Sequence, residues 1–426
     1  MRSTVPQGTR ALPASDLSAC RARLLRDSPL RRRGGKVALG ILLAVMAAMA
    51  APIWRDWLSP AANIPILLAG MLAALIGSLP ALMLLRFLHR RHADVRPIAW
   101  GVLLVGTVLS TAAAAFLNTH SPAQALTVGF NEEFWKVVPL LLLAAFLPRA
   151  VIGVRDGIVY GALGGIGFNI MELSVYLIRA SYPAHGLLLG LQDQFGRLGL
   201  WGVDNHVVWS ALTGAGIGYA VQEGRGRLRF AVAVGAYLLA VLTHTMQDNV
   251  VGIVLLVTLL LAVLQVAGIR DADIGTPSPE TAEAARHYAQ TAAGLEVLAI
   301  NALNLPLLLI ALVKSGRWER KAIAEALADE PEGIVTEAEM AGIRADRLLR
   351  TRRIPGLPRP VAASIRTAQN ALAFQKIHLR RRGLDPDDDA VTGYWRARLL
   401  ALRGARTSTQ WEVVGPAGLE PATRPL

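Results

Sequence analysis

The feature that most constrains this chain is its set of long apolar runs, because about 20 apolar residues cross the hydrocarbon core of a bilayer as a helix. Nine stretches reach or approach that length, at residues 37–54, 64–87, 98–117, 125–147, 157–178, 206–221, 230–249, 251–268 and 295–313. Hydrophobic residues make up 53% of the chain and charged residues only 18%, which excludes an ordinary soluble protein. We predict an all-α fold: a polytopic transmembrane helix bundle of about 8–9 spans with a soluble helical C-terminal region.

Basic residues set the expected orientation of these spans. Four clusters, in the N-terminal tail and at 86–96, 149–155 and 225–229, fall in alternate connections between spans. The positive-inside rule therefore places all of them in the cytoplasm. Nine spans would leave the Arg-rich C-terminal region outside, which the same rule disfavours. We therefore expect an even number of crossings, with either a re-entrant segment late in the chain or an additional crossing within 179–205.

Composition divides the chain into four parts. These are a basic cytoplasmic tail at 1–36, a transmembrane bundle at 37–313, a soluble basic helical region at 314–406 and a disordered tail at 407–426. Within the third part, Thr336 and Glu339 resemble a capping box that opens a helix. The net charge of +13 fits basic clusters at the cytoplasmic face of a multi-pass plasma-membrane protein. The lipid bilayer, and no nucleic acid, is therefore an expected partner.

One apolar segment carries charges in its interior. Residues 131–136 read Asn-Glu-Glu-Phe-Trp-Lys, and a charged side chain at the bilayer centre costs roughly 3 kcal/mol on insertion scales, so it marks a functional site by default. A buried ion pair between Glu132 and Lys136, four residues apart, would explain one Glu and the Lys. It would leave the second Glu unexplained. We therefore take Glu132, Glu133 and Lys136 as candidate catalytic residues.

Four more polar side chains interrupt later spans, namely Glu172, His206, His244 and Asp248. His244 and Asp248 are four residues apart, so both face one direction on a helix. Successive spans alternate in direction, and each residue advances a helix by about 1.5 Å. On this count the Glu pair, Glu172 and the two His fall in one layer in the outer half of the membrane. Independent structural ion pairs have no reason to align in this way.

The residue types in this layer suit hydrolysis. Two His and a Glu can hold Zn²⁺ and leave a position for water, and a further Glu can accept the proton of that water. We assign the general base to one Glu of the 132–133 pair. Glu172, His206 and His244 are then ligands of a divalent metal, with Zn²⁺ expected, and Asp248 orients His244 or is itself a ligand. No HExxH motif is present, which excludes the soluble zincin arrangement, and the one cysteine lies in the N-terminal tail.

The order and spacing of these motifs resemble those of the PrsW-type intramembrane proteases. The resemblance consists of Glu132-Glu133-x-x-Lys136 on one span, Phe168-x-x-x-Glu172 on the next, His206 at the head of a third and His244-x-x-x-Asp248 on a fourth. It covers about residues 100–270 and leaves 1–35 and 315–426 outside. The family is distantly related to the CAAX prenyl endopeptidases and bacteriocin-processing enzymes, whose corresponding motif is EExxxR.

The resemblance implies cleavage of a membrane-anchored protein near the extracytoplasmic face. Family members are described as site-1 proteases that begin the regulated proteolysis of anti-sigma factors. The resemblance leaves the mechanism open, because the CAAX-type relatives are argued to be either metal enzymes or glutamate-dependent enzymes in which His and Asn stabilise the oxyanion.

Two other functions use the same residues differently. A proton- or ion-coupled transporter would use the buried carboxylates and histidines as a relay, but the sequence shows no inverted repeat, which counts against it. A catalytically inactive scaffold, whose C-terminal helices bind a partner, would lack a motif residue, and none is missing.

Overall fold

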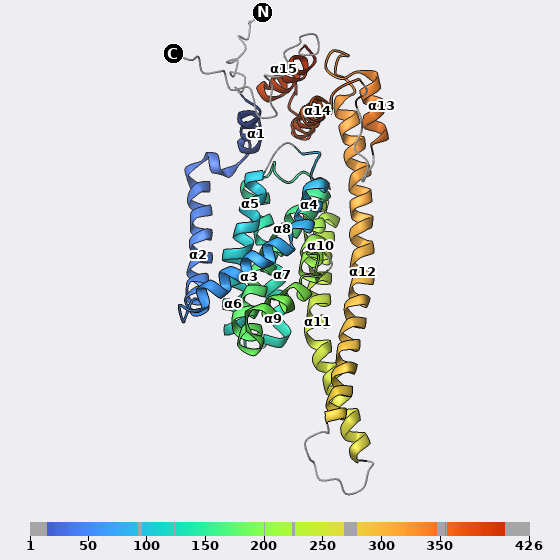
Figure 1. The fold of residues 1–426 in the computed structure, drawn as a ribbon. Helices are drawn as coiled ribbons and strands as arrows, with labels where there is room; N and C mark the ends of the chain where they lie inside the picture. The colour runs from blue at the N-terminus through green and yellow to red at the C-terminus, as the bar shows by residue number, and fades with distance from the viewer. Residues whose placement is uncertain are drawn as a thin grey trace, which may run out of the picture.

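The computed structural model describes residues 15–92, 96–122, 124–199, 201–223, 226–267, 279–346, 354 and 356–404. Helices account for 83% of the structure, and no strand occurs within the described ranges. The all-α prediction is confirmed. Figure 1 shows a helix bundle from which the long helices α11 and α12 extend, side by side, beyond one end.

The helices follow one another as α1 (Asp16–Leu25), α2 (Arg33–Trp57), α3 (Asn63–Gly77), α4 (Leu79–Leu88), α5 (Arg96–Val105), α6 (Thr111–His120), α7 (Gln124–Phe146), α8 (Val154–Tyr176), α9 (Tyr182–Arg197), α10 (Asn205–Glu223), α11 (Leu228–Ala267), α12 (Pro279–Leu327), α13 (Glu337–Ala345), α14 (Arg359–Arg380) and α15 (Ala390–Gly404). A short 3₁₀ helix, η1 (Pro29–Arg31), precedes α2. Two π-helical turns, η2 (Gly106–Ser110) and η3 (Leu177–Ser181), join α5 to α6 and α8 to α9.

Five helical stretches among the described residues are long and apolar enough to cross a membrane: Arg33–Trp57, Pro97–His120, Val154–Arg197, Leu228–Asp248 and Ala299–Leu327. The pair α3 and α4, bent by 46°, would make a sixth span if it crosses as one unit. Helices α7 and α10 also form where the sequence predicts spans, but they are not among these stretches. Helix α7 carries two Glu and a Lys in its interior, and these charges interrupt its apolar sequence.

Two predicted segments take a different form in the structure. The spans expected at 230–249 and 251–268 are one continuous helix, α11. The polar residues 247–249 interrupt the hydropathy there, but the segment contains no proline that would break the backbone. The mixed segment 179–205 contains the helix α9, which is interrupted by non-helical geometry at Gly186, where φ is 76°.

Helix α8 lies at the centre of the bundle, and nearly all of its side chains are buried. A Cβ atom at Gly157 would overlap the carbonyl oxygen of Gly214 in α10, and one at Gly164 would overlap that of Lys136 in α7. Small residues at such contacts let helix backbones approach closely. Helices α7 and α10 are therefore held directly against α8, which also carries Glu172.

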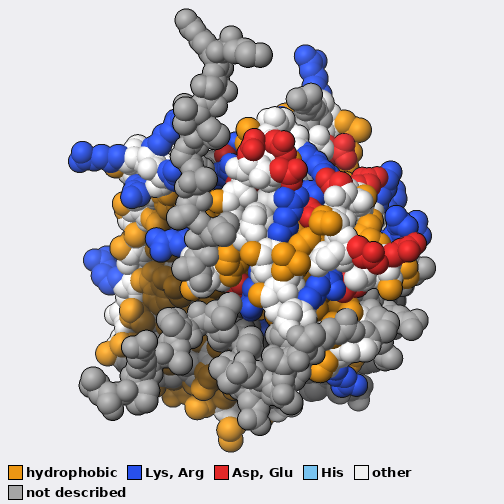
Figure 2. Space-filling model, turned by 90° about the horizontal axis from the view of Figure 1, so that it is seen from above, with side chains coloured by type: hydrophobic (Ala, Val, Ile, Leu, Met, Phe, Trp, Pro, Cys, Tyr) orange, Lys and Arg blue, Asp and Glu red, His pale blue; other side chains and the backbone are white. Residues whose placement is uncertain are grey.

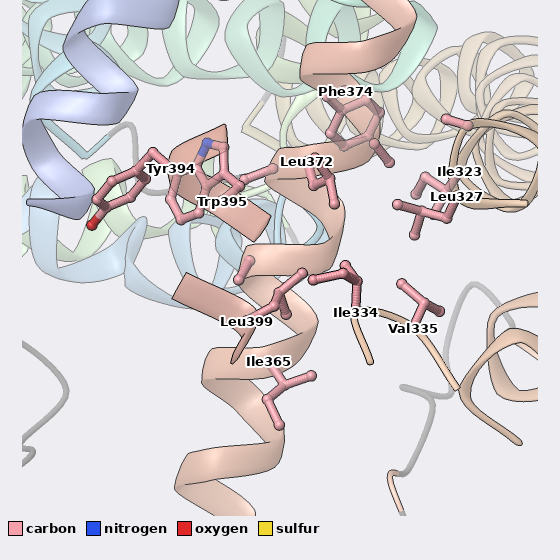
Figure 3. Packing of buried hydrophobic residues seen from close by; sticks show 14 of the residues in the cluster. Ile323, Leu327, Ile334, Val335, Ile365, Leu372, Phe374, Tyr394, Trp395 and Leu399 are labelled. Atoms are coloured by element: carbon pink, nitrogen blue, oxygen red, sulfur yellow. The ribbon is translucent and has the colours of Figure 1, made fainter. Parts of the chain in front are cut away.

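The first helix and the C-terminal helices share one hydrophobic core. Ala19 and Cys20 of α1 pack in the same cluster as buried residues of α12, α13, α14 and α15. Figure 3 shows this packing, with Phe374 of α14, Trp395 of α15 and Leu327 of α12 in one cluster. The two ends of the described chain therefore lie at the same end of the bundle (Figure 1), which is the arrangement that an even number of crossings produces.

This end of the molecule is charged on its surface. Figure 2 shows acidic and basic side chains gathered on the face seen from that end. The predicted capping box at the start of α13 is confirmed, because the Thr336 side chain accepts from the Glu339 backbone and the Glu339 side chain accepts from the Thr336 backbone. An abundance of charge and a capped surface helix are both typical of a region in contact with water.

Candidate active site

The predicted site residues come from four helices, α7, α8, α10 and α11, which pack against one another in the bundle (Figure 1). They are Glu132, Glu133 and Lys136 of α7, Glu172 of α8, His206 of α10 and His244 and Asp248 of α11. The structure brings all of them into one connected cluster. The catalytic and metal-binding roles assigned to them from the sequence stay predictions.

Lys136 is the buried cation of this cluster. Its ammonium donates to Glu133 Oε1 at 2.8 Å and lies 3.4 Å from Glu132 Oε2. It is also 2.6 Å from His206 Nδ1 and 4.6 Å from the centre of the Phe168 ring. Lys136 therefore contacts both carboxylates of its own helix and connects them to α10.

The two histidines present ring nitrogens near the Glu132 carboxylate. One ligand atom from each of Glu132, His206 and His244 lies within 4.8 Å of the others. The two imidazole planes are at 87°, with centroids 5.2 Å apart. His244 Nδ1 is 2.9 Å from Glu133 Oε1, and a carboxylate can only accept, so Nδ1 carries the proton. His244 Nε2, 3.7 Å from Glu132 Oε2, is then unprotonated and able to bind a metal.

Two further carboxylates flank the imidazoles. Glu172 Oε2 is 3.4 Å from His206 Nε2, and Asp248 Oδ2 is 3.4 Å from His244 Nε2 with the Asp248 side chain 39% exposed. Within the described part of the chain, buried oxygens of Glu133 and Glu172 have no hydrogen-bond partner. When ionised, four carboxylates face one ammonium here, and a divalent cation would offset this excess of negative charge. The donor set therefore fits a divalent metal.

Sequence reasoning missed several residues that touch this cluster. Asn118 of α6 donates to Glu132 Oε1 at 3.2 Å, and Trp209 of α10 stacks on His244 with centroids 4.4 Å apart. Trp209 is three residues after His206, so helical spacing could have indicated it. Asn118 follows the end of a predicted span, where a polar residue does not by itself indicate a functional site. Asp204 caps α10 through the Val207 N–H at 3.0 Å, and burial raises the pKa of its carboxyl to about 7.

Comparison with known families agrees with this geometry. Residues 66–269 match the model of the PrsW family of intramembrane metalloproteases. This region is similar to the PrsW family. The matched segment contains every predicted site residue. No curated protein and no solved structure matches the chain.

The match to the PrsW family model indicates the general activity. The chain is a membrane-embedded protease and a multi-pass integral membrane protein. Its substrate is a membrane protein within the lipid bilayer, and the family implies a divalent metal.

A second group of possible ligands lies at the opposite end of α8. Asp156 Oδ1 is 3.0 Å from His89 Nε2 and 3.2 Å from His92 Nδ1. The two imidazoles are stacked, with centroids 4.6 Å apart and planes only 8° from parallel. Because an imidazole nitrogen binds a metal in the plane of its ring, parallel stacked rings cannot direct both nitrogens at one ion. The crossed rings of His206 and His244, at 87°, do not have this restriction, which distinguishes the candidate active site from this group.

Proposed function

We propose that this PrsW-family protein is a zinc-dependent peptidase that hydrolyses a membrane-anchored protein near the extracytoplasmic face of the plasma membrane. The observation that carries the proposal is the convergence of Glu132, His206 and His244 from three helices, with ligand atoms within 4.8 Å. Two imidazoles and a carboxylate form a common catalytic zinc set, in which one position stays open for water. When bound, such an ion would lower the pKa of that water to about 7.

The contacts favour a distribution of roles that differs from the one inferred from the sequence. Glu133 accepts from Lys136 at 2.8 Å and from His244 Nδ1 at 2.9 Å. It is therefore suited to orient the imidazole, as carboxylates beside metal-binding histidines do. Glu132 faces the two imidazoles and is our proposed third ligand, whereas the sequence assigns that position to Glu172.

Glu172 is then the proposed general base. Its Oε2 atom is buried, lies 3.4 Å from His206 Nε2 and has no hydrogen-bond partner among the described residues. A carboxylate oxygen in that position can accept a proton from a water molecule beside the imidazole. Asp248, on the other side of His244 and partly exposed, supports the position of that ring.

The side of the membrane follows from charge. Arg149 pairs with Asp27 and Arg155, at the start of α8, pairs with Glu319 of α12. Glu172 lies near the other end of α8, so the site is at the opposite end of the bundle from these basic connections. By the positive-inside rule, the basic end faces the cytoplasm. We accordingly propose that residues 1–36 and 314–406 are cytoplasmic, and that the site opens towards the outside. A membrane-anchored anti-sigma factor is the substrate that the family resemblance favours.

Two glutamine substitutions test this assignment. We expect Glu132→Gln to reduce bound zinc well below about one ion per chain. Glu172→Gln should keep the zinc and slow cleavage of a single-span reporter protein by about 10²-fold or more. Elemental analysis of the purified proteins and gel-based cleavage in proteoliposomes measure the two effects. Glu325→Gln, with a side chain that is 65% exposed on α12, is the matched control.

The outcomes separate the alternatives. If Glu172→Gln loses zinc while Glu132→Gln keeps it and is inactive, the roles inferred from the sequence are correct. If both variants cleave the reporter at the wild-type rate, the cluster is not the site of hydrolysis and the proposed function is wrong.

A further inference from the structure

Asn118 is a buried amide at the end of α6 that contacts the proposed zinc ligand Glu132. Its Nδ2 atom donates to Glu132 Oε1 at 3.2 Å. The other oxygen of the same carboxylate, Oε2, lies 3.4 Å from Lys136 Nζ and 3.7 Å from His244 Nε2. Asn118 therefore contacts one oxygen of the carboxylate, while the other oxygen, Oε2, lies near Lys136 and His244.

The amide of Asn118 is itself held in one orientation. Asn131 Nδ2 donates to Asn118 Oδ1 at 3.1 Å, so the carbonyl side of the Asn118 amide faces Asn131 and its NH₂ group faces Glu132. Asn118 and Glu132 are both only 9% exposed. Hydrogen bonds to an ionised carboxylate are roughly twice as strong as neutral ones, and little water is available here to replace this one.

From these contacts we infer that Asn118 is a positioning residue for the Glu132 carboxylate. This inference rests on the proposed function. It engages Glu132 Oε1 and thereby presents Oε2 to the metal position between His206 and His244. Without the amide, the Glu132 carboxylate can turn and offer both oxygens to the nearby ammonium of Lys136. The zinc site would then lose a correctly oriented ligand, although none of its ligands has been removed.

Zinc affinity measures this role directly. Asn118→Leu keeps a similar volume and removes the donor, and we expect zinc to bind about 10- to 100-fold more weakly, the usual loss when a group that orients a metal ligand is removed. Asn131→Ala, which removes only the contact that holds the amide, should give a smaller loss. Thr119→Ala is the matched control, because the Thr119 hydroxyl is exposed and, among the described residues, donates to Ala115 O of its own helix and not to the cluster.

The measurement is competition for Zn²⁺ with a chelator of known affinity, on purified full-length protein. The melting temperature of the metal-free protein is recorded beside it. A purely structural link between α6 and α7 would lower that melting temperature and leave the zinc affinity of the folded protein unchanged, which would overturn the inference. If Asn118→Leu does not fold, the zinc affinity and the melting temperature of Asn118→Ala are measured instead. A weaker zinc affinity supports the inference, and an unchanged zinc affinity with a lower melting temperature overturns it.

A double-mutant cycle identifies the residue through which Asn118 acts. In a Glu132→Ala background, Asn118→Leu should cause no further loss of zinc affinity, because the carboxylate that it positions is absent. An undiminished loss in that background would contradict the inference. A wild-type protein that binds no zinc would instead refute the proposed function, so the two failures can be told apart.

Discussion

In the candidate active site, neighbouring charges stabilise individual buried side chains. Lys136 is buried and contacts Glu132 and Glu133, and its ammonium is the cation that lets two adjacent carboxylates exist inside a helix bundle. The sequence identifies this group by residue type and spacing. It does not determine which oxygen or nitrogen faces which partner, because that depends on side-chain rotamers fixed by the other helices.

Removing the Lys136 charge tests this balance. We expect Lys136→Met to destabilise the protein by about 3–5 kcal/mol, because it leaves buried carboxylates without their cation, and to abolish cleavage. Thermal unfolding in detergent gives the stability change. Lys321→Met is the control, since the Lys321 side chain is 79% exposed and pairs only loosely with Glu325 at 3.7 Å. Equal stability of the two variants would show that Lys136 does not neutralise the pair.

Among the helices, α8 connects the fold to the chemistry. Its glycines bring backbones of neighbouring helices into direct contact, and the contact at Gly164 is with the carbonyl group of Lys136. The central position of α8 could be predicted, because glycines at four-residue spacing favour close packing in membranes. The continuity of α11 and the helical form of α9 could not, because hydropathy reports polarity and not whether the backbone breaks.

Gly164→Ala tests the link between helix packing and the site. The added Cβ would overlap the Lys136 carbonyl oxygen and push α7 away from α8. We expect a loss of about 1–3 kcal/mol in stability, as for other overpacked cores, together with weaker zinc binding, because Glu132 and Glu172 would separate. Gly101→Ala in α5 is the control, since a Cβ there meets no atom within 4 Å. If Gly164→Ala binds zinc as tightly as the wild type, close packing of α8 against α7 is not required for the geometry of the site.

In the whole molecule, the N-terminal and C-terminal segments are attached to the bundle by buried charges. Glu319 of α12 pairs with Arg91 at 3.0 Å and with Arg155 of α8 at 3.2 Å, and Arg149 donates to Asp27 at 2.5 Å. These pairs connect residues far apart in the sequence. They place the Arg-rich connections and both terminal segments at the end of the bundle away from the proposed active site.

Thiol labelling tests the resulting topology. In a Cys20→Ser background, Trp201→Cys lies in an exposed position (73%) before α10, and Leu384→Cys lies in an exposed position (44%) after α14. We expect a membrane-impermeant maleimide added to intact cells to label the first and not the second. Both should be labelled after the membrane is permeabilised. Labelling of both in intact cells would place the two ends of the bundle on one side and contradict the proposed orientation.

The sequence by itself determined that the protein is a helical membrane protein, which residue types form its site and which family motif they follow. Apolar run length and intramembrane charge are local properties, so they can be read along the chain. Only the tertiary structure shows that α1 packs against the C-terminal helices and that two predicted spans form the single helix α11. It also shows that Asn118 contacts Glu132. These features depend on contacts between segments distant in sequence, and on the orientation of individual oxygen and nitrogen atoms, which packing alone decides.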